Sequence, residues 1–306
     1  MWFRNLTLFR LSNRTARALD DLEAGLEQHR LRECGPMELA THGFVSPYGR
    51  DEEALIHRLA DHTLLTCATE SRLLPNSVVN DELADRLRQL RDQRKRRIGA
   101  RERREIKDQV LNELLPRAFT HTNRVNAYFC HKTGWLVVDT SSRKAAEQVV
   151  HELRQALGSL PAVPMAPEQS PRTLMTDWLI SGKLPPGLVL ADECELRDPT
   201  ETGAVVRCRR QDLESEEIRG HLKSSKQVFQ LGLIFDDRIE FVLGDDLTVR
   251  KLRFLDSVSD ELDTTEMESP SAEIGARFAL MALELDRLLS KFEQCFGLSR
   301  PDDSSG

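Results

Sequence analysis

Residues 86–108 carry the densest positive charge in the sequence. This window, RLRQLRDQRKRRIGARERREIKD, holds eleven Arg or Lys residues against four Asp or Glu residues, so its formal charge is +7 while the other 283 residues sum to −14. Clustered cations bind nucleic-acid phosphates, because each neutralised phosphate releases counterions whatever the base sequence. The predicted DNA-binding residues here are Arg86, Arg88, Arg91, Arg94, Lys95, Arg96, Arg97, Arg101, Arg103 and Arg104. The alternative is a solvated pair of helices joined by ion pairs, although such a face usually interleaves more acids than RDQRKRR does.

A second basic group falls in the C-terminal strands and could form one face with the first. Its members are Arg207, Arg209, Arg210, Lys223, Lys226, Arg250, Lys251 and Arg253. Outward-facing residues of an ordinary antiparallel sheet would explain the same pattern, because such sheets commonly leave one face in water. Aromatic residues are not interleaved with these cations as in single-strand stacking surfaces, so base-specific recognition is not predicted.

One group of carboxylates could recruit Mg²⁺ for phosphodiester cleavage. Asp236 and Asp237 lie at one end of a predicted hairpin strand, Asp245 and Asp246 lie at the other, and Glu240 lies between them. The two ends are too far apart for one site, and Asp is favoured in turns for backbone reasons. A metal-dependent nuclease is therefore the third hypothesis.

Motifs for other chemistry are missing. The six cysteines form no C-x-x-C pair, the eight histidines form no H-E-x-x-H, and the sixteen glycines make neither phosphate-binding glycine pattern. G-x-S-x-G is missing as well. A metal site is not predicted, and nucleotide hydrolysis and serine-esterase chemistry lose their usual markers.

The composition indicates a globular protein whose charge is unevenly distributed along the sequence. An apolar fraction of 40% over 306 residues is enough to bury a core, and the net charge of −7 repels DNA as a mean field. No uncharged run approaches the roughly 18 residues of a spanning helix, and Arg4 and Arg10 interrupt the apolar start. We therefore expect a cytoplasmic protein without a membrane segment.

Residues 76–116 are predicted to form a projecting helical hairpin. Val79, Leu83, Leu87 and Leu90 form one apolar stripe, and the next position on that stripe is Arg94. A second stripe runs from Ile106 to Leu115, with Gly99-Ala100 as the turn between the helices. A helix whose buried face turns basic cannot continue along a core, so the outer eight residues should stand clear by about 12 Å.

Strands and helices without regular β-α-β alternation predict an α+β fold, with mixed, largely antiparallel sheets. We expect an N-terminal part, 1–75 and 117–168, and a C-terminal part, 169–300, separated by the Pro-rich LGSLPAVPMAP. The C-terminal part ends in a long helix that opens at Ser269-Pro270 and closes by Gly297. Residues 301–306 are predicted to be a disordered tail.

Six separated blocks resemble the family of the bacterial recombination-associated protein RdgC, in the same order and over nearly the whole chain. They are WFRNLTLFRLS, CGPMELATHGFVSPYG, LLPNSVVND, LLPRAFTHTN, LGSLPAVP and RRQDLESEEI. The resemblance implies a head-to-head ring-shaped homodimer whose positive hole encircles DNA, single- or double-stranded, without sequence preference. It also implies that the protein limits the RecA recombinase, associates with the nucleoid, is not an enzyme and needs no cofactor.

The resemblance also implies dimer-interface residues. The LLPRAF block makes Phe119 the apolar plug of a ring-closing contact, and the RRQDL block makes Arg210 and Gln211 the polar contact at a second interface. Position alone would favour Phe119 in its own core, because Phe is among the more buried residues. The resemblance reverses that preference.

The resulting prediction is a DNA-binding ring dimer that antagonises the recombinase by occupying DNA. A chain of net charge −7 can present a positive inner rim while its acidic exterior discourages adventitious binding. The second hypothesis, from another class, is a protein–protein regulator that contacts the recombinase directly through the basic hairpin.

Overall fold

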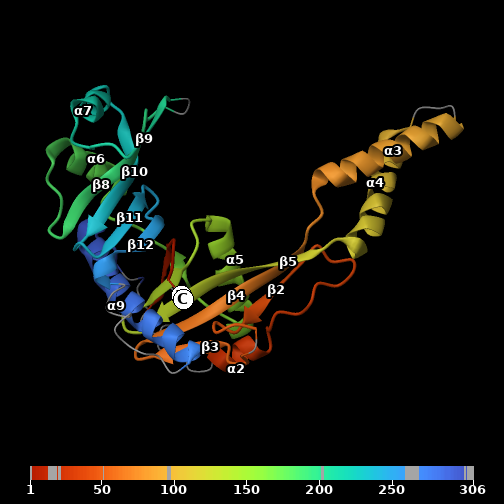
Figure 1. Ribbon diagram of the computed structural model, residues 1–306, viewed down its shortest axis with the longest axis horizontal. Coiled ribbons are helices and arrows are strands. Elements are labelled where there is room, and N and C mark those ends of the chain that lie inside the picture. The colour runs from red at the N-terminus through yellow and green to blue at the C-terminus, as the bar shows by residue number, and fades with distance from the viewer. Residues whose placement is uncertain are drawn as a thin grey trace.

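The computed structural model describes residues 2–12, 19, 22–50, 52–94, 98–200, 203–258, 269–299 and 301, with Arg94 and Pro270 as backbone only. The chain forms a crescent of antiparallel sheets and helices, with the helical hairpin at one end (Figure 1). The predicted α+β class, largely antiparallel sheets and projecting basic hairpin are therefore confirmed. The predicted tail, apart from Pro301, and the basic residues Lys95, Arg96 and Arg97 lie outside the described residues.

Seven antiparallel strands form the larger sheet, in the order β2-β4-β5-β6-β1-β7 with β3 beside β4. Their bounds are β1 Thr7–Arg10, β2 Ala40–Val45, β3 Ile56–Leu59, β4 His62–Arg72, β5 Thr120–Cys130, β6 Trp135–Val138 and β7 Val163–Pro164. β4 and β5 pair over eleven residues each, from His62 with Cys130 to Arg72 with Thr120. This ladder carries the chain from the body to the hairpin (Figure 1).

Helix α5, Arg143–Leu157, packs with the short helix α2, Leu22–Glu27, against the larger sheet. Ser142 caps the start of α5 by accepting a hydrogen bond from the Ala145 amide, and Gly158 ends it in the left-handed region at φ 70°. The buried stripe of α5 is Ala146, Val149, Val150 and Leu153.

Five antiparallel strands form the smaller sheet, in the order β12-β11-β10-β8-β9. Their bounds are β8 Leu188–Arg197, β9 Val205–Arg209, β10 Gln227–Phe235, β11 Ile239–Gly244 and β12 Val249–Phe254. The accompanying helices are α6 Pro171–Ser181, α7 Glu216–Lys223 and α9 Pro270–Phe296. None of the helices in the described ranges is long and apolar enough to cross a membrane.

One apolar core joins the two sheets through α9. Tyr128 and Trp135 of the larger sheet, Phe241 of the smaller sheet, and Phe278 and Phe292 of α9 belong to a single buried cluster. At the same seam Arg10 of β1 forms an ion pair of 2.6 Å with Glu293 of α9, and its guanidinium lies 4.1 Å from the centre of the Trp135 ring. The parts that the sequence separates at the Pro-rich segment therefore share one core.

The hairpin has a small core of its own. It consists of α3, Asn76–Arg94, and α4, Ala100–Leu114, and the 3₁₀ turn η2, Leu115–Arg117, leads back to β5. Leu83, Leu87 and Ile106 are buried between the helices, and Leu90 and Ile98 pack against them. This cluster is separate from the two cores of the body. The hairpin should therefore be able to unfold while the body of the chain stays folded.

We expect Leu87→Ala to destabilise the hairpin by about 2–3 kcal/mol, because it truncates a buried side chain of a small cluster. Hydrogen exchange followed by mass spectrometry should show faster exchange in residues 76–114 without a change in the melting temperature of the body. Leu288→Ala, in the shared core, is the control and should lower that melting temperature. Equal melting shifts for the two variants would contradict an independent hairpin.

Candidate nucleic-acid interface

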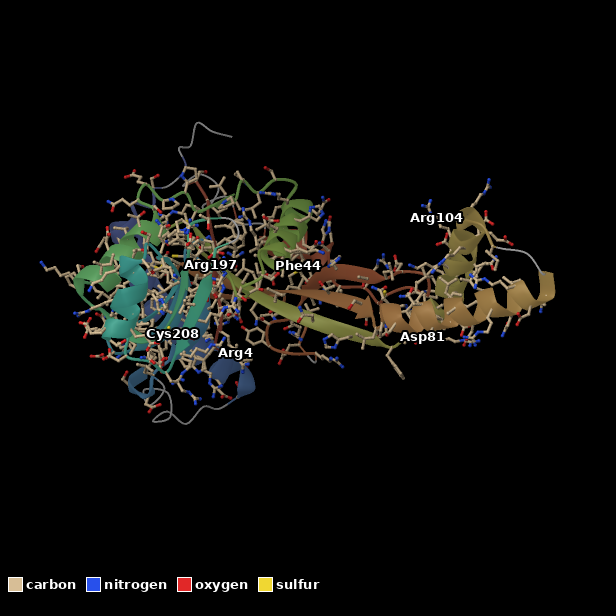
Figure 2. All side chains as sticks on the ribbon, turned by 90° about the horizontal axis from the view of Figure 1, so that it is seen from above. Arg4, Phe44, Asp81, Arg104, Arg197 and Cys208 are labelled. Atoms are coloured by element: carbon tan, nitrogen blue, oxygen red, sulfur yellow. The ribbon has the colours of Figure 1, made fainter. Side chains whose placement is uncertain are left out.

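The hairpin presents most of its cations to solvent. Arg88, Arg91, Arg101, Arg103 and Arg104 are exposed on α3 and α4, and Figure 2 places Arg104 far from the body. The sequence pattern explains this placement, because the apolar stripe of α3 holds the partner helix only as far as Leu90. A surface of guanidinium groups results, without a base-reading pocket.

Arg86 differs from the other predicted DNA-binding residues because it joins the two helices. Its guanidinium donates to Glu82 of α3 at 3.0 Å and to Glu113 of α4 at 2.9 Å. Hydrogen bonds to Glu113 and Glu82 raise the pKa of Arg86, and the hydrogen bond from Arg86 lowers the pKa of Glu113. Its first role is to hold the hairpin together.

The other hairpin cations are more readily available to phosphates. Arg88 pairs with Asp85 at 3.3 Å and Arg101 with Glu105 at 3.1 Å, both at exposed positions where an ion pair contributes at most about 1 kcal/mol. Within the described ranges, Arg91, Arg103 and Arg104 have no recorded ion pair. At the N-cap of α4, Gly99 supplies no side-chain hydrogen bond, so the first amides of that helix also face outward.

Half of the eight C-terminal cations, Arg207, Arg250, Lys251 and Arg253, are paired with acids. Lys251 contacts Glu193, Arg253 lies 3.5 Å from Glu240, and Arg250 lies 3.2 Å from Asp246. Arg209, directly opposite Glu193 on the neighbouring strand, is exposed, and so is Lys223 at the end of α7. Lys226 is half-buried, with its Nζ 3.4 Å from the Ser224 hydroxyl.

Arg207 has a structural partner in Glu195. The Glu195 side chain is 7% exposed and accepts a hydrogen bond of 2.6 Å from Arg207 and another of 2.6 Å from Arg197. Burial alone would raise the pKa of Glu195, but the hydrogen bonds and charges of Arg207 and Arg197 outweigh it and lower the pKa. Arg207 and Arg197 together therefore favour the ionised form of this buried carboxylate.

The two basic groups lie at opposite ends of a single chain. The hairpin stands at one end of the crescent and β8, β9 and α7 stand at the other (Figure 1). The eleven-residue β4–β5 ladder separates them, so the expectation that both groups form one face stays a prediction.

Phe119 lies at the base of the hairpin and is 84% exposed. The interpretation from position alone, which placed it in its own core, is wrong. Its carbonyl accepts a hydrogen bond of 2.7 Å from the amide of Leu73, which is also exposed, and Leu39 accepts one of 2.9 Å from the Arg72 amide. Phe119 and Leu73 are therefore exposed neighbours at the ends of adjacent strands, and Leu39, which is 65% exposed, lies beside Arg72 at the start of the next strand.

Arg210 and Gln211 lie at the other end of the chain, just after β9. They line a hollow of about 900 Å³ together with Asp212, Glu214 and the exposed Val189. Arg210 adopts the left-handed conformation at φ 54°, and the Gln211 amide donates to the Asp192 carbonyl at 3.0 Å. The chain thus turns sharply at this rim and presents both side chains beside the hollow.

The carboxylates considered for a nuclease do not converge. Asp236 pairs with Arg287 at 2.6 Å, and Asp245 pairs with Arg172 at 2.6 Å at the opposite end of β11. Asp236 and Asp237 have φ values of 50° and 53°, as the turn interpretation requires. Among the described residues, these acids form no group close enough to share a metal ion.

Comparisons with known proteins agree with the six sequence blocks. A family model described as "RdgC: Putative exonuclease, RdgC" matches residues 1–299. Recombination-associated protein RdgC of Xanthomonas campestris pv. campestris (strain B100) is 45% identical over 303 residues, which is 99% of this chain and 100% of that protein. The protein of the same name from Stenotrophomonas maltophilia (strain R551-3) is also 45% identical over the same shares, and that of Xanthomonas oryzae pv. oryzae (strain PXO99A) is 43% identical.

We expect Arg207→Gln to lower the free energy of unfolding at pH 7 by about 1–2 kcal/mol, because Glu195 loses one of its two charged donors. A group with a lowered pKa stabilises the fold above its unfolded pKa and loses that contribution as the pH falls through its folded pKa. The difference in the free energy of unfolding between wild type and Arg207→Gln, measured by urea unfolding, should therefore shrink below about pH 4. Arg209→Gln is the matched control on β9, and an equal loss there would argue against the Glu195 pairing.

Proposed function

This chain belongs to the RdgC family, and from that premise we propose that it is a ring-forming homodimer that encircles DNA without sequence preference. The relatives are named for their association with recombination. The proposed role is negative regulation of a RecA-type recombinase during recombination and replication, by occupation of the DNA on which the recombinase must assemble. Binding of single and double strands and association with the nucleoid are parts of the same proposal.

The observation that carries the proposal is the position of the candidate contacts at opposite ends of the crescent. The exposed Phe119 lies at the base of the hairpin, and Arg210 with Gln211 lies beside the hollow beyond β9. Two copies related by a two-fold axis close a ring if each end meets its own copy. A closed ring requires two contacts of this kind, and a simple dimer requires only one.

The distribution of positive charge supports DNA as the ligand that the proposed ring encircles. Exposed Arg91, Arg103 and Arg104 are cations without ion pairs in the described part of the hairpin, and phosphates would supply their counter-charges. The rest of the chain is acidic enough to bring the net charge to −7. Binding should therefore be confined to the basic surfaces.

We propose that the protein is not a nuclease, although the family model's description includes the word exonuclease. Two-metal phosphodiester cleavage needs carboxylates that hold ions about 3.5–4 Å apart. Asp236 and Asp245 instead pair with Arg287 and Arg172 at opposite ends of one strand.

Charge reversal on the hairpin tests DNA binding. We expect the triple variant Arg91→Glu, Arg103→Glu and Arg104→Glu to bind duplexes of unrelated sequence more weakly, and to the same extent for each. The logarithm of the binding constant should also fall less steeply with log[salt], because each phosphate contact contributes about −0.9 to that slope. Gel shifts across a salt series measure both. Arg143→Glu, which reverses an exposed charge on α5, is the control. In a separate test for nuclease activity, addition of Mg²⁺ should leave every duplex uncleaved.

The same variants separate occlusion of DNA from direct contact with the recombinase. If occlusion is the mechanism, recombinase inhibition should fall in parallel with DNA affinity. Inhibition that survives the loss of DNA binding would instead favour a protein–protein regulator. A strong preference for one duplex sequence would contradict the proposed mode of binding.

Truncation of Phe119 tests the ring-closing contact. We expect Phe119→Ala to weaken the hairpin-end association by about 2 kcal/mol or more, as a buried aromatic anchor does in an interface. The melting temperature of the monomer should not fall, because the side chain is 84% exposed in the single chain. Analytical ultracentrifugation and calorimetry make the comparison, with retention of circular DNA as the functional measurement. A normal dimer constant together with early melting would contradict the interface role.

A further inference from the structure

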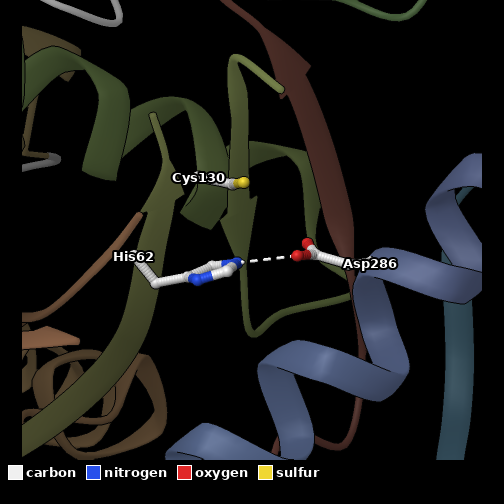
Figure 3. Close-up of side chains that lie close together, drawn as sticks. All are labelled: His62, Cys130 and Asp286. Atoms are coloured by element: carbon white, nitrogen blue, oxygen red, sulfur yellow. Dashed lines mark hydrogen bonds and ion pairs between the residues drawn. The ribbon is translucent and has the colours of Figure 1, made fainter. Parts of the chain in front are cut away.

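A polar cluster lies at the seam where β4, β5 and α9 meet. His62 begins β4 and Cys130 ends β5, and the two residues are direct partners in the antiparallel register. Asp286 of α9 lies over them, with its Oδ2 3.0 Å from Nε2 of His62 (Figure 3). One potential ligand atom from each residue lies within 4.8 Å of the other two.

The three side chains converge on one point. Figure 3 shows the Cys130 sulfur and the Asp286 carboxylate on the same side of His62, near Nε2. In a nucleophilic relay the imidazole lies between its partners, with the carboxylate on one nitrogen and the nucleophile on the other. The observed arrangement suits a shared cation better than a proton relay.

Two buried oxygen atoms, one in this cluster and one in a neighbouring residue, have no hydrogen-bond partner within the described ranges. One is the hydroxyl of Tyr128, a fully buried residue that shares a strand face with Cys130 two positions later. Its ring centre lies 5.7 Å from that of His62. The other is Oδ1 of Asp286. Buried polar atoms without a hydrogen bond destabilise the fold, so such a pair needs an explanation that a cation would supply.

We propose that this cluster binds Zn²⁺, with Cys130 Sγ, His62 Nε2 and the Asp286 carboxylate as ligands and the Tyr128 hydroxyl beside the fourth position. Mixed sulfur, nitrogen and oxygen donors select zinc, whereas Mg²⁺ and Ca²⁺ select oxygen alone. Zinc bonds of about 2.0–2.3 Å place tetrahedral donors about 3.3–3.7 Å apart, so atoms that lie within 4.8 Å of one another need to close by no more than about 1.5 Å. On binding, the Cys130 thiol and His62 Nε2 release their protons to the buffer.

The ion would fasten the terminal helix to the larger sheet. His62 and Asp286 are 224 residues apart in the sequence, so a metal bond between them closes a long loop across the shared core. The site lies at the opposite end of the β4–β5 ladder from the hairpin, about 34 Å away at 3.4 Å per residue. Zinc should therefore change stability without changing the DNA-binding surface of the hairpin.

Cobalt substitution in the full-length chain tests the site. Protein reduced with a phosphine and stripped with a chelator should bind one equivalent of Co²⁺, with a thiolate-to-cobalt charge-transfer band and intense tetrahedral visible bands that Zn²⁺ removes. Cys130→Ser should lose the charge-transfer band and at least about tenfold in zinc affinity. Cys67→Ser is the matched control, since Cys67 is buried on the neighbouring strand β4 in a different core.

Thermal unfolding gives a readout that does not depend on the thiol. Zn²⁺ should raise the melting temperature of wild type and Cys67→Ser, but not that of Asp286→Asn, whose side chain is 30% exposed and tolerates substitution. Wild-type protein without a cobalt charge-transfer band would overturn the proposal. So would a natively folded Cys130→Ser or Asp286→Asn variant with wild-type zinc affinity.

Discussion

The pairing of β4 with β5 is the interaction on which the rest of the structure depends. The eleven-residue ladder contributes Leu65 and Phe129 to the core under α5, and Leu64 and Tyr128 to the core under α9. Successive side chains of a strand point to opposite faces, so one pair of strands can support both cores. The far end of the ladder continues into the hairpin, and its near end holds His62 beside Cys130.

Because both cores are built on that ladder, the two ends of the crescent have a defined separation. The shared cluster around α9 fixes the smaller sheet on the larger one, and the Arg10–Glu293 ion pair lies at the same seam. The hairpin alone has an independent apolar cluster. The body is therefore a spacer of set length, and the hairpin is the element with the weakest link to it.

Sequence patterns predicted the parts of this arrangement that depend on neighbours along the chain. The stripe from Val79 to Leu90, ending at a basic position, predicted that the hairpin leaves the body, and Ser269-Pro270 and Gly297 predicted the two ends of the last helix. Pairing between distant strands could not be predicted in the same way. The Arg207–Glu195 ion pair depends on the β8–β9 register, and the exposure of Phe119 depends on where the hairpin joins the sheet. His62, Cys130 and Asp286 meet only through tertiary contacts, so no spacing rule finds them.

The placement of Phe119 and Arg210 at opposite ends also governs how a ring would open. Once two copies of the chain meet at one end, their other ends face each other at a high effective concentration, because the body between them is a spacer of set length. Closure is then an intramolecular equilibrium that does not depend on protein concentration. A ring of this kind could release one contact, admit DNA through the gap and close again while the second contact keeps the two subunits together.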